Sequence, residues 1–286
     1  MLTREAFISQ FGTGVHLLDG ATGTVLIAAG MPRGCCTEAW ILEHPQVIKD
    51  LQRAYAEAGS EIIYAPTFRA QPMVLAAHGL ADQTEEINRK LIALSRSAAP
   101  DCLIAGNLTT LRGCIDTSDS ANLARMTADY QRQIAALVEG EADLLAAETL
   151  MHPLEARAIL TAAAAENAPA TMISFACKSD GSLYSSHAAA DALRLTQDTG
   201  AAAVGINCIA ADDTLPDLLA KLRQHVQVPL LCKPNAGRAV QGRYPVDVKY
   251  FARIVRSCIK QGANLVGGCC GTSPEYIRSI HDGIKS

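Results

Sequence analysis

Short apolar runs alternate with longer amphipathic segments along the whole chain, and the alternation occurs eight times. Apolar runs separated by helix-length segments are typical of parallel strands that helices cover on both faces. The expected strands are Val15–Leu18, Glu61–Ala65, Cys102–Ala105, Leu144–Ala147, Thr171–Phe175, Ala203–Ile206, Pro229–Cys232 and Asn264–Val266. Helical periodicity is clearest in Asn122–Glu139 and Pro153–Glu166. Eight such repeats predict an α/β fold, a (β/α)8 TIM barrel that forms a single domain over residues 1–286.

A doubly wound open sheet is the alternative architecture for the same pattern. That fold usually carries a Gly-x-Gly-x-x-Gly turn after its first strand, and the turn after Leu18 lacks this spacing. The longest segments without periodicity are Ala28–Cys36 and Ser179–His187. We expect both to be loops at the mouth of the barrel, or pieces of a lid.

Composition narrows the class of protein. With 49% hydrophobic and 19% charged residues, the 286-residue chain has the balance of a soluble globular protein. The formal net charge is -4, and the basic residues are scattered, which argues against nucleic acid or an anionic membrane as a partner. The sequence contains neither an apolar run of about 20 residues nor the apolar core of a signal peptide. A cytoplasmic location is therefore expected.

Ten cysteines are many for a chain of this length. Disulfides belong mainly to secreted proteins with small cores, a class that this composition does not fit. Cysteines inside the apolar runs are expected to be small buried hydrophobes; these are Cys102, Cys177 and Cys232. Cys35, Cys36 and Cys258 are expected to be packing or surface thiols. A metal or reactive role is thus expected for only a few of the ten.

Polar residues gather where the expected strands end, which is where TIM barrels carry their chemistry. These segments are Asp19-Gly-Ala-Thr-Gly-Thr24, Pro66-Thr-Phe68, Gly106-Asn-Leu-Thr109, Glu148-Thr149, Lys178-Ser-Asp-Gly181, Asn207-Cys208, Lys233-Pro-Asn-Ala-Gly237 and Cys269-Cys270. Two of the eight are of special interest, because they bring cysteines to the ends of the sixth and eighth strands.

Cys208 ends the sixth strand, and Cys269 and Cys270 end the eighth. The two strands flank the seventh, so they lie about 9–10 Å apart at typical strand spacing, and inward-pointing thiols can meet at one metal ion across that gap. Three thiolates with a vacant fourth position are typical of a catalytic zinc site. Asn235, at the end of the seventh strand, is a candidate weak oxygen ligand that a substrate displaces.

Such a site suits the activation of a substrate thiol. A thiol that coordinates zinc loses its proton near neutral pH, and the electron-rich metal leaves the sulfur nucleophilic toward an alkyl group. Asp19 and Glu148 are candidates to hold an α-ammonium group. The backbone N–H groups of the Gly20–Gly23 turn are candidates to receive a carboxylate. Together these features favour an amino-acid thiol as substrate.

The motifs resemble those of the zinc-dependent homocysteine S-methyltransferase family. They are Asp19-Gly-Ala-Thr-Gly-Thr, Glu148-Thr-Leu, Gly205-Ile-Asn-Cys208, Lys233-Pro-Asn-Ala-Gly237 and Gly267-Gly-Cys-Cys-Gly-Thr-Ser-Pro-Glu275, in order along nearly the whole chain. The resemblance implies a barrel with Zn²⁺ on Cys208, Cys269 and Cys270 and homocysteine as methyl acceptor. The substrate-binding residues are then Asp19, Gly20, Glu148, Asn207 and Asn235.

The first motif is more similar to the homocysteine module of cobalamin-dependent methionine synthase than to relatives that use betaine or S-methylmethionine. We expect none of the folate, cobalamin and reactivation domains of that enzyme within these 286 residues. It also departs from the module at Ala65-Pro-Thr-Phe68 and at Gly106-Asn107. The expected donor is a methylated corrinoid or methyltetrahydrofolate acting through cobalamin, with the cobalamin on a separate partner protein. A sulfonium or ammonium donor of the S-methylmethionine or betaine type remains the alternative.

Two further hypotheses about the function stay open at this point. Lys233 is a candidate Schiff-base lysine, with Gly267–Gly271 as a phosphate cradle, which would make the protein an aldolase. That hypothesis leaves the converging cysteines unexplained. The other hypothesis is that the protein is a non-catalytic subunit that binds a thiol or a metal within a larger complex.

Overall fold

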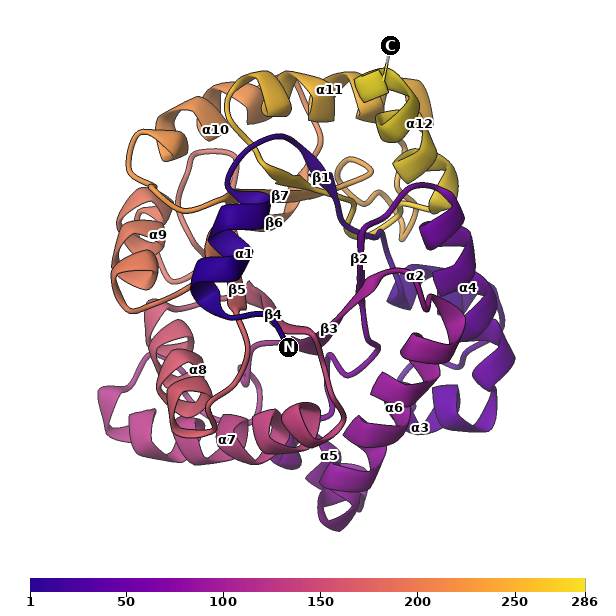
Figure 1. Cartoon of the computed structure of the whole chain (residues 1–286), viewed down its shortest axis with the longest axis vertical. Helices are drawn as coiled ribbons and strands as arrows, with labels where there is room; N and C mark the ends of the chain where they lie inside the picture. Colours follow the sequence, from indigo (N-terminus) through magenta and orange to yellow (C-terminus); the bar gives the residue numbers. More distant parts are fainter. Residues whose placement is uncertain (286) are drawn as a thin grey trace.

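The computed structural model describes residues 1–285 and confirms the predicted (β/α)8 TIM barrel (Figure 1). Within these residues, eight parallel strands form one sheet in the order β1-β8-β7-β6-β5-β4-β3-β2. A parallel bridge between Leu18 and Ile62 joins the first strand to the second and closes the ring. Ser286, the last residue of the predicted domain 1–286, lies outside the described residues.

Each predicted apolar run coincides with a strand. The strands are β1 (His16–Leu17), β2 (Ile62–Tyr64), β3 (Leu103–Leu108), β4 (Leu144–Leu150), β5 (Thr171–Ala176), β6 (Ala203–Ala210), β7 (Leu230–Asn235) and β8 (Leu265–Val266). Several of them run past their predicted ends, because the polar residues at the strand ends still pair with the neighbouring strand. Lys233, for example, pairs with Asn207 in the β6–β7 ladder.

Helices surround the barrel and connect successive strands. They are α1 (Arg4–Phe11), α2 (Gly23–Ala28), α3 (Thr37–Glu43), α4 (Pro45–Glu57), α5 (Pro72–Ala76), α6 (Thr84–Ala98), α7 (Leu123–Glu139), α8 (Pro153–Ala165), α9 (Ala189–Asp198), α10 (Leu215–Arg223), α11 (Val248–Lys260) and α12 (Pro274–Lys285), with short 3₁₀ turns at Ala81–Gln83 and Ser120–Asn122. Helix α12 begins at Pro274, directly after Ser273. His152 caps α8 by accepting a hydrogen bond from the Leu154 N–H at 3.1 Å. Among residues 1–285, no helix has both the length and the apolarity needed to span a membrane.

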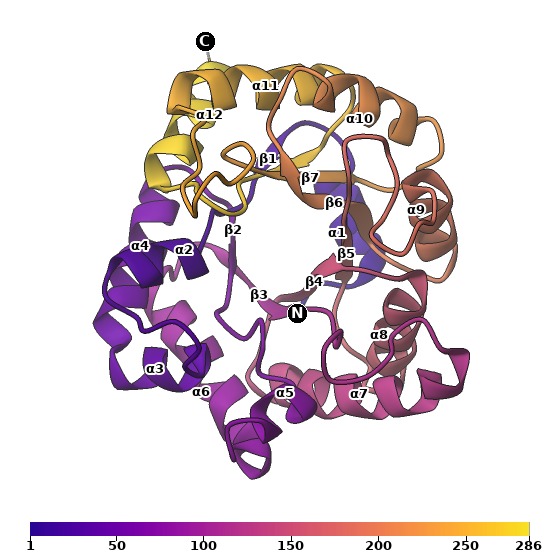
Figure 2. The ribbon, with the colours of Figure 1, turned by 180° about the vertical axis from the view of Figure 1, so that it is seen from behind.

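The first helix closes the N-terminal end of the barrel. Phe7 and Phe11 of α1 are buried against residues from the barrel interior, including Leu18 and Ile62. In Figure 1 this helix lies across the ring of strands, and Figure 2 shows the same ring from the opposite side. A larger apolar cluster fills the layer between the strands and the outer helices. The barrel is therefore packed at one end, and the open chemistry is confined to the other.

Long loops follow the strands at that other end (Figure 2). Of the predicted irregular segments, residues 29–36 form turns after α2, and residues 179–187 form turns with isolated bridges that join Cys177 to Leu183 and Ser182 to Ala188. Both predictions are confirmed. Cys102, Cys177 and Cys232 are buried, as expected for cysteines inside apolar runs.

Candidate functional site

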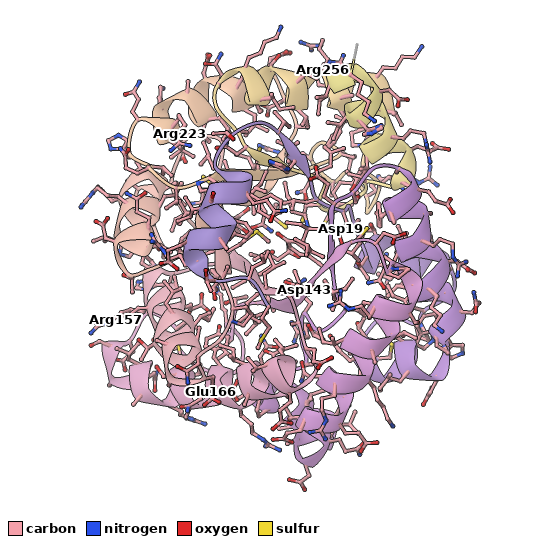
Figure 3. The ribbon with its side chains drawn as sticks, in the orientation of Figure 1. Asp19, Asp143, Arg157, Glu166, Arg223 and Arg256 are labelled. Atoms are coloured by element: carbon pink, nitrogen blue, oxygen red, sulfur yellow. The ribbon has the colours of Figure 1, made fainter. Side chains whose placement is uncertain are left out.

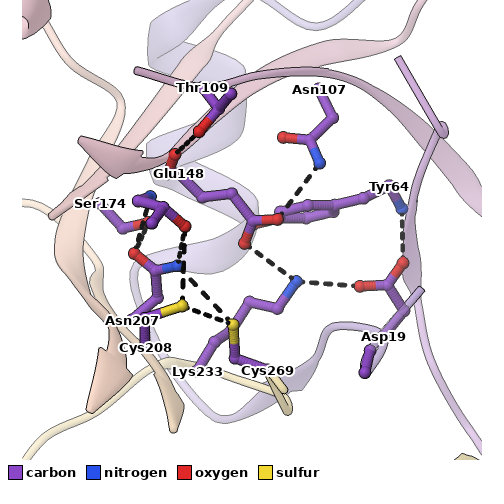
Figure 4. Close-up of polar contacts among 12 residues, drawn as sticks. Asp19, Tyr64, Asn107, Thr109, Glu148, Ser174, Asn207, Cys208, Lys233 and Cys269 are labelled. Carbon is purple, nitrogen blue, oxygen red and sulfur yellow. Dashed lines mark hydrogen bonds and ion pairs between the residues drawn. The ribbon is translucent and has the colours of Figure 1, made fainter. Parts of the chain in front are cut away.

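The sulfur atoms of Cys208, Cys269 and Cys270 converge at the C-terminal ends of β6 and β8. In the described part of the chain, these three residues form the one group of metal-ligating side chains whose atoms all lie within 4.8 Å of one another. The Sγ atoms of Cys208 and Cys269 are 3.1 Å apart (Figure 4). We call these three residues the sulfur cluster. The convergence that the sequence predicted is confirmed.

An unusual backbone conformation turns Cys208 toward the cluster. Its φ angle is +54°, and the β6–β7 register shifts between Asn207 and Ala210. Thr149 repeats the arrangement at the end of β4, with φ +63° next to a register shift in the β4–β5 pair. Left-handed conformations cost a residue with a side chain roughly 1–3 kcal/mol and are found mostly at functional sites. Side chains of consecutive strand residues otherwise point to alternate faces of the sheet. The left-handed residue makes a kink in the strand, and the kink interrupts this alternation.

Contacts with β7 hold the two neighbouring cysteines in place. The Cys269 N–H donates to the Pro234 carbonyl at 2.8 Å, and the Ala236 N–H donates to the Cys270 carbonyl at 2.9 Å. Gly271 follows with φ +81°, and the Tyr244 ring packs so closely over it that a side chain would not fit there. The glycine-rich bend after β8 therefore positions both thiols on the wall of a cavity at this end of the barrel.

The protonation of the sulfur cluster fits a soft metal cation. Hydrogen bonds with Cys208 and then Cys270, together with burial, raise the pKa of the Cys269 thiol well above its usual value. Hydrogen bonds from Cys208 and then Cys269 lower the pKa of Cys270. Since the pKa of the Cys208 thiol is raised too, the cluster without a cation holds its negative charge on Cys270, and a thiolate-binding cation would displace the protons of the other two thiols. Asn235 Oδ1 is also buried and accepts no hydrogen bond within residues 1–285, as expected of an oxygen that awaits a partner.

A second polar group lies across the same end of the barrel. The Lys233 ammonium is 3.0 Å from Asp19 Oδ1 and 3.5 Å from Glu148 Oε2, and it sits 3.6 Å from the centre of the Tyr64 ring. Figure 4 shows the ammonium between the two carboxylates, and Figure 3 places Asp19 inside the ring of helices. We call Asp19, Glu148 and Lys233 the charged triad.

Backbone and amide groups fix the two carboxylates. The Tyr64 N–H donates to Asp19 Oδ2 at 2.8 Å, and Asn107 Nδ2 donates to Glu148 Oε1 at 3.2 Å. Burial raises the pKa of Asp19, while Lys233 and then the Tyr64 N–H act in the opposite direction. Burial alone would lower the pKa of Lys233, but Asp19 and Glu148 outweigh it and hold that pKa well above the usual value. Since Lys233 faces two carboxylates, it is the group that keeps its proton.

This environment argues against the Schiff-base hypothesis. A lysine that attacks a carbonyl must lose its proton readily, which requires an apolar or cationic setting. Lys233 is buried in the reverse setting, in ion pairs with two acids. The aldolase interpretation is therefore abandoned, and its lysine belongs to the charged triad.

The sulfur cluster and the charged triad line one cavity of about 420 Å³. Asp19, Gly20 and Glu148 border it, as predicted. Apolar side chains cover much of the remaining wall; they include Ile27, Met31, Pro66 and Phe68. Gly20 is required by close packing, because a side chain there would meet the hydroxyl groups of Tyr55 and Thr272. The cavity thus joins a soft sulfur site to a charged site through an apolar space.

Asn207 and Asn235 do not border this cavity within the described residues. Asn207 is fully buried, and its amide is used by neighbours: Nδ2 donates to Thr149 Oγ1 at 2.7 Å, and Oδ1 accepts from the Ser174 hydroxyl at 3.2 Å. Its Nδ2 also lies 3.9 Å from Cys269 Sγ. The structure places Asn207 beside the sulfur cluster as a support, rather than in the space open to a substrate.

Sequence reasoning did not assign Tyr64, Asn107 or Thr149 to the site, and it gave Lys233 a different role. A signal for Lys233 was present, because it is a charged residue that shares the inward face of its strand with Leu231. Asn107 and Thr149 were noted as polar residues at strand ends, but their partners depend on register between strands. Tyr64 carried no signal, because an aromatic residue in an apolar strand is usually core, and the contacts of its N–H with Asp19 and of its ring with Lys233 depend on the tertiary structure.

Comparison with known proteins gives consistent matches. The sequence model of the family described as homocysteine S-methyltransferase matches residues 16–284. The chain is 25% identical to the methionine synthase of Mycobacterium leprae over 285 residues, which cover 92% of this chain but 24% of that protein. It is 27% identical to the homocysteine S-methyltransferase YbgG of Bacillus subtilis over 299 residues, with 92% of each chain covered.

A solved structure resembles the barrel closely. The metallated form of the homocysteine methyltransferase MmuM from Escherichia coli superposes with a TM-score of 0.81 at 26% identity, covering 95% of this chain and 96% of that one. The chain thus spans about a quarter of the methionine synthase it matches and nearly all of the shorter relatives. These matches confirm the resemblance that the motifs predicted.

Proposed function

Because this chain belongs to the homocysteine S-methyltransferase family, we propose that it methylates the thiol of homocysteine to give methionine. One observation carries the proposal: the sulfur atoms of Cys208, Cys269 and Cys270 lie within 4.8 Å of one another on a cavity that also holds buried carboxylates. The transfer forms a bond between the acceptor sulfur and the methyl carbon, breaks the bond between that carbon and the donor, and releases the thiol proton.

Zn²⁺ is the metal that this donor set suits, with Cys208, Cys269 and Cys270 as its ligands. A zinc ion bound by thiolates supplies a place where a further thiol loses its proton near neutral pH and stays nucleophilic. Asn207 supports the cluster through its contact with Cys269 Sγ at 3.9 Å. Asn235, whose buried Oδ1 accepts no hydrogen bond among residues 1–285, ends β7, which lies between the strands that lead to the cysteines.

The rest of the cavity binds and orients the amino-acid end of the acceptor. Glu148 presents a carboxylate oxygen that accepts no hydrogen bond among residues 1–285, and it receives the α-ammonium group. Gly20 and the turn that follows border the cavity and receive the carboxylate through backbone N–H groups. The apolar wall of Ile27, Met31 and Phe68 keeps water away from the reacting sulfur.

The donor is a methylated corrinoid, or methyltetrahydrofolate acting through cobalamin, with the cobalamin on a separate protein. The similarity to the methionine synthase of Mycobacterium leprae supports the corrinoid donor. The full-length match to MmuM and to YbgG supports the alternative of a small sulfonium donor such as S-methylmethionine. These donors differ in size and charge, so they are distinguished by direct assay.

A donor panel tests the proposal. Purified protein loaded with Zn²⁺ is incubated with homocysteine and, in turn, methylcobalamin, methyltetrahydrofolate with a cobalamin protein, S-methylmethionine and betaine, and methionine is quantified. We expect methionine from a corrinoid donor and none from the same mixture with Cys208→Ser protein. Tight thiol binding without transfer from any donor would instead identify a non-catalytic thiol-binding subunit.

A further inference from the structure

Lys233 occupies the place between Asp19 and Glu148 where the ammonium group of a bound amino acid would otherwise stand. Its Nζ lies 3.0 Å from the first carboxylate and 3.5 Å from the second. Its side chain is 2% exposed, and Tyr64 covers it with the ring centre at 3.6 Å. The chain therefore carries its own ammonium at this point, and the two carboxylates are not equally available to a ligand.

Asp19 is fully engaged by the protein. One of its oxygens faces Lys233, and the other accepts the Tyr64 N–H at 2.8 Å. Only 2% of its side chain is exposed. An ammonium group that enters the cavity would have to compete with Lys233 to reach it, and the Lys233 side chain is itself only 2% exposed.

Glu148 is engaged on one side only. Its Oε1 accepts from Asn107 at 3.2 Å, whereas Oε2 is buried, accepts no hydrogen bond in the described chain and is 3.5 Å from Lys233. The side chain is 13% exposed and borders the cavity. Two carboxylates and one ammonium leave one negative charge in the charged triad, and Glu148 is where a ligand can meet it.

We infer that Lys233 is a specificity-determining residue, which neutralises Asp19 and leaves Glu148 as the carboxylate that receives the ammonium of the acceptor. Asp19 is then a positioning residue that acts through Lys233. Since like charges repel across this buried space, Lys233 also weakens the preference for thiols that carry an amino group. The expected acceptors are anionic thiols of the size of homocysteine, with only moderate discrimination against those that lack the amino group. This inference rests on the proposed function.

The test uses two acceptors that differ only in the amino group, homocysteine and 4-mercaptobutyrate. Their dissociation constants are measured by calorimetry on Zn²⁺-loaded protein, and the ratio of the two isolates the contribution of the ammonium. We expect Glu148→Gln to reduce the preference for homocysteine about 10- to 100-fold, as for the loss of a charged hydrogen bond, and Asp19→Asn to change it less than about threefold. Lys233→Met is expected to increase the preference about tenfold, because the competing ammonium is gone.

Equal losses of preference in Asp19→Asn and Glu148→Gln would overturn the inference, because Asp19 would then contact the acceptor directly. Lys178→Met is the matched control, since it removes a lysine at the same end of the barrel that does not border the cavity within residues 1–285. An equal change in this control would assign the effect to net charge and would also overturn the inference.

The outcome is separable from that of the proposed function. Thermal unfolding verifies the folding of each variant, and if Lys233→Met does not fold, the comparison of Asp19→Asn with Glu148→Gln decides alone. Failure of methyl transfer with thiol binding intact would contradict the proposed activity without touching the binding ratio. A ratio that does not respond to Glu148→Gln, in protein that does transfer methyl groups, would contradict only the inference about Lys233.

Discussion

The sulfur cluster and the charged triad border the same cavity, but they are completed in opposite ways. The sulfur cluster brings together three groups that repel one another when all are ionised, so three thiolates would be stable there only together with a cation from outside. The charged triad places an ammonium between two carboxylates, so most of its charge is balanced within the chain. A cluster of side chains with the same charge thus indicates a site for a ligand of opposite charge. Side chains of opposite charge instead balance each other and limit which ligands can bind there.

The strongest way to break this comparison is to remove one sulfur atom. We expect Cys269→Ala to lose Zn²⁺ and to lower methyl transfer by about a thousandfold or more, since two thiolates no longer hold the metal in a catalytic site. Metal content by elemental analysis and methionine formation measure the two effects. Cys114→Ala is the control, because this thiol is exposed and distant from the cluster. Full activity in metal-free Cys269→Ala protein would contradict the proposal.

The charged triad should respond in stability. Lys233→Met leaves two buried carboxylates without their counter-ion, and we expect the free energy of unfolding to fall by about 3–5 kcal/mol. The double variant Asp19→Asn, Lys233→Met removes both charges of the closer pair and should recover most of that loss. Denaturant titration measures both. A double variant as unstable as the single one would mean that packing, and not charge, makes Lys233 important.

The same pair predicts a pH dependence. The pKa of Lys233 is raised above its unfolded value by Asp19 and Glu148 despite burial, so its contribution to stability is complete below the unfolded pKa of about 10.4. It is lost as the pH rises through the folded pKa. We therefore expect the stability difference between wild type and Lys233→Met to hold up to about pH 10 and to narrow above it. A difference that narrows on moving from about pH 8 to pH 10 would contradict this assignment.

Asn207 supports the sulfur cluster, and its removal should sharpen the comparison. In the wild type, Asn207 Oδ1 accepts hydrogen bonds from the Thr149 N–H at 2.9 Å and from the Ser174 hydroxyl. Asn207→Ala leaves both donors without their buried partner. We expect a loss of about 1–3 kcal/mol in stability and a 10- to 100-fold loss in Zn²⁺ affinity, as for other residues that support metal ligands. Competition with a chelator measures the affinity. Unchanged metal binding in a folded variant would mean that the cysteines hold their positions unaided.

The smallest effect is expected for an ion pair on the outside of the barrel. Arg132 and Glu85 join α7 to α6 in a pair whose side chains are more than a third exposed. Replacing Arg132 with Met should cost less than about 1 kcal/mol, and the cost should shrink in high salt, because water and ions screen exposed charges. Unfolding at two salt concentrations measures it. A salt-independent loss as large as that of Lys233→Met would remove the distinction between buried and exposed charge.

The barrel and the sulfur cluster could be predicted from the sequence because each depends on a local pattern. The apolar runs from Val15–Leu18 to Asn264–Val266 identified the strands, and the position of the cysteines at strand ends placed them at one opening. The charged triad was predicted only in part. Asp19 and Glu148 were expected near the substrate, but the place of Lys233 depends on the register of β7 against its neighbours, which no local pattern records.

The kinks at Cys208 and Thr149 were also beyond sequence reasoning. Glycine and asparagine are the usual signs of a left-handed residue, and neither position has one. The surrounding contacts impose the conformation instead, since the Thr149 N–H and hydroxyl are both held by Asn207. Predicted strand ends at Ala147 and Ile206 fell short of the observed ones for the same reason, because the chain resumes pairing after each kink.

The closure of the N-terminal end of the barrel by Phe7 and Phe11 has a kinetic consequence. Because these rings fill the N-terminal end of the barrel, the reactants that meet at Cys208 must all enter and leave through the opening at its C-terminal end. The acceptor extends further into the cavity, toward Glu148. A donor that is already bound at the opening would therefore block its entry. We therefore expect compulsory-order turnover in which the thiol enters before the methyl donor and the methylated product departs last.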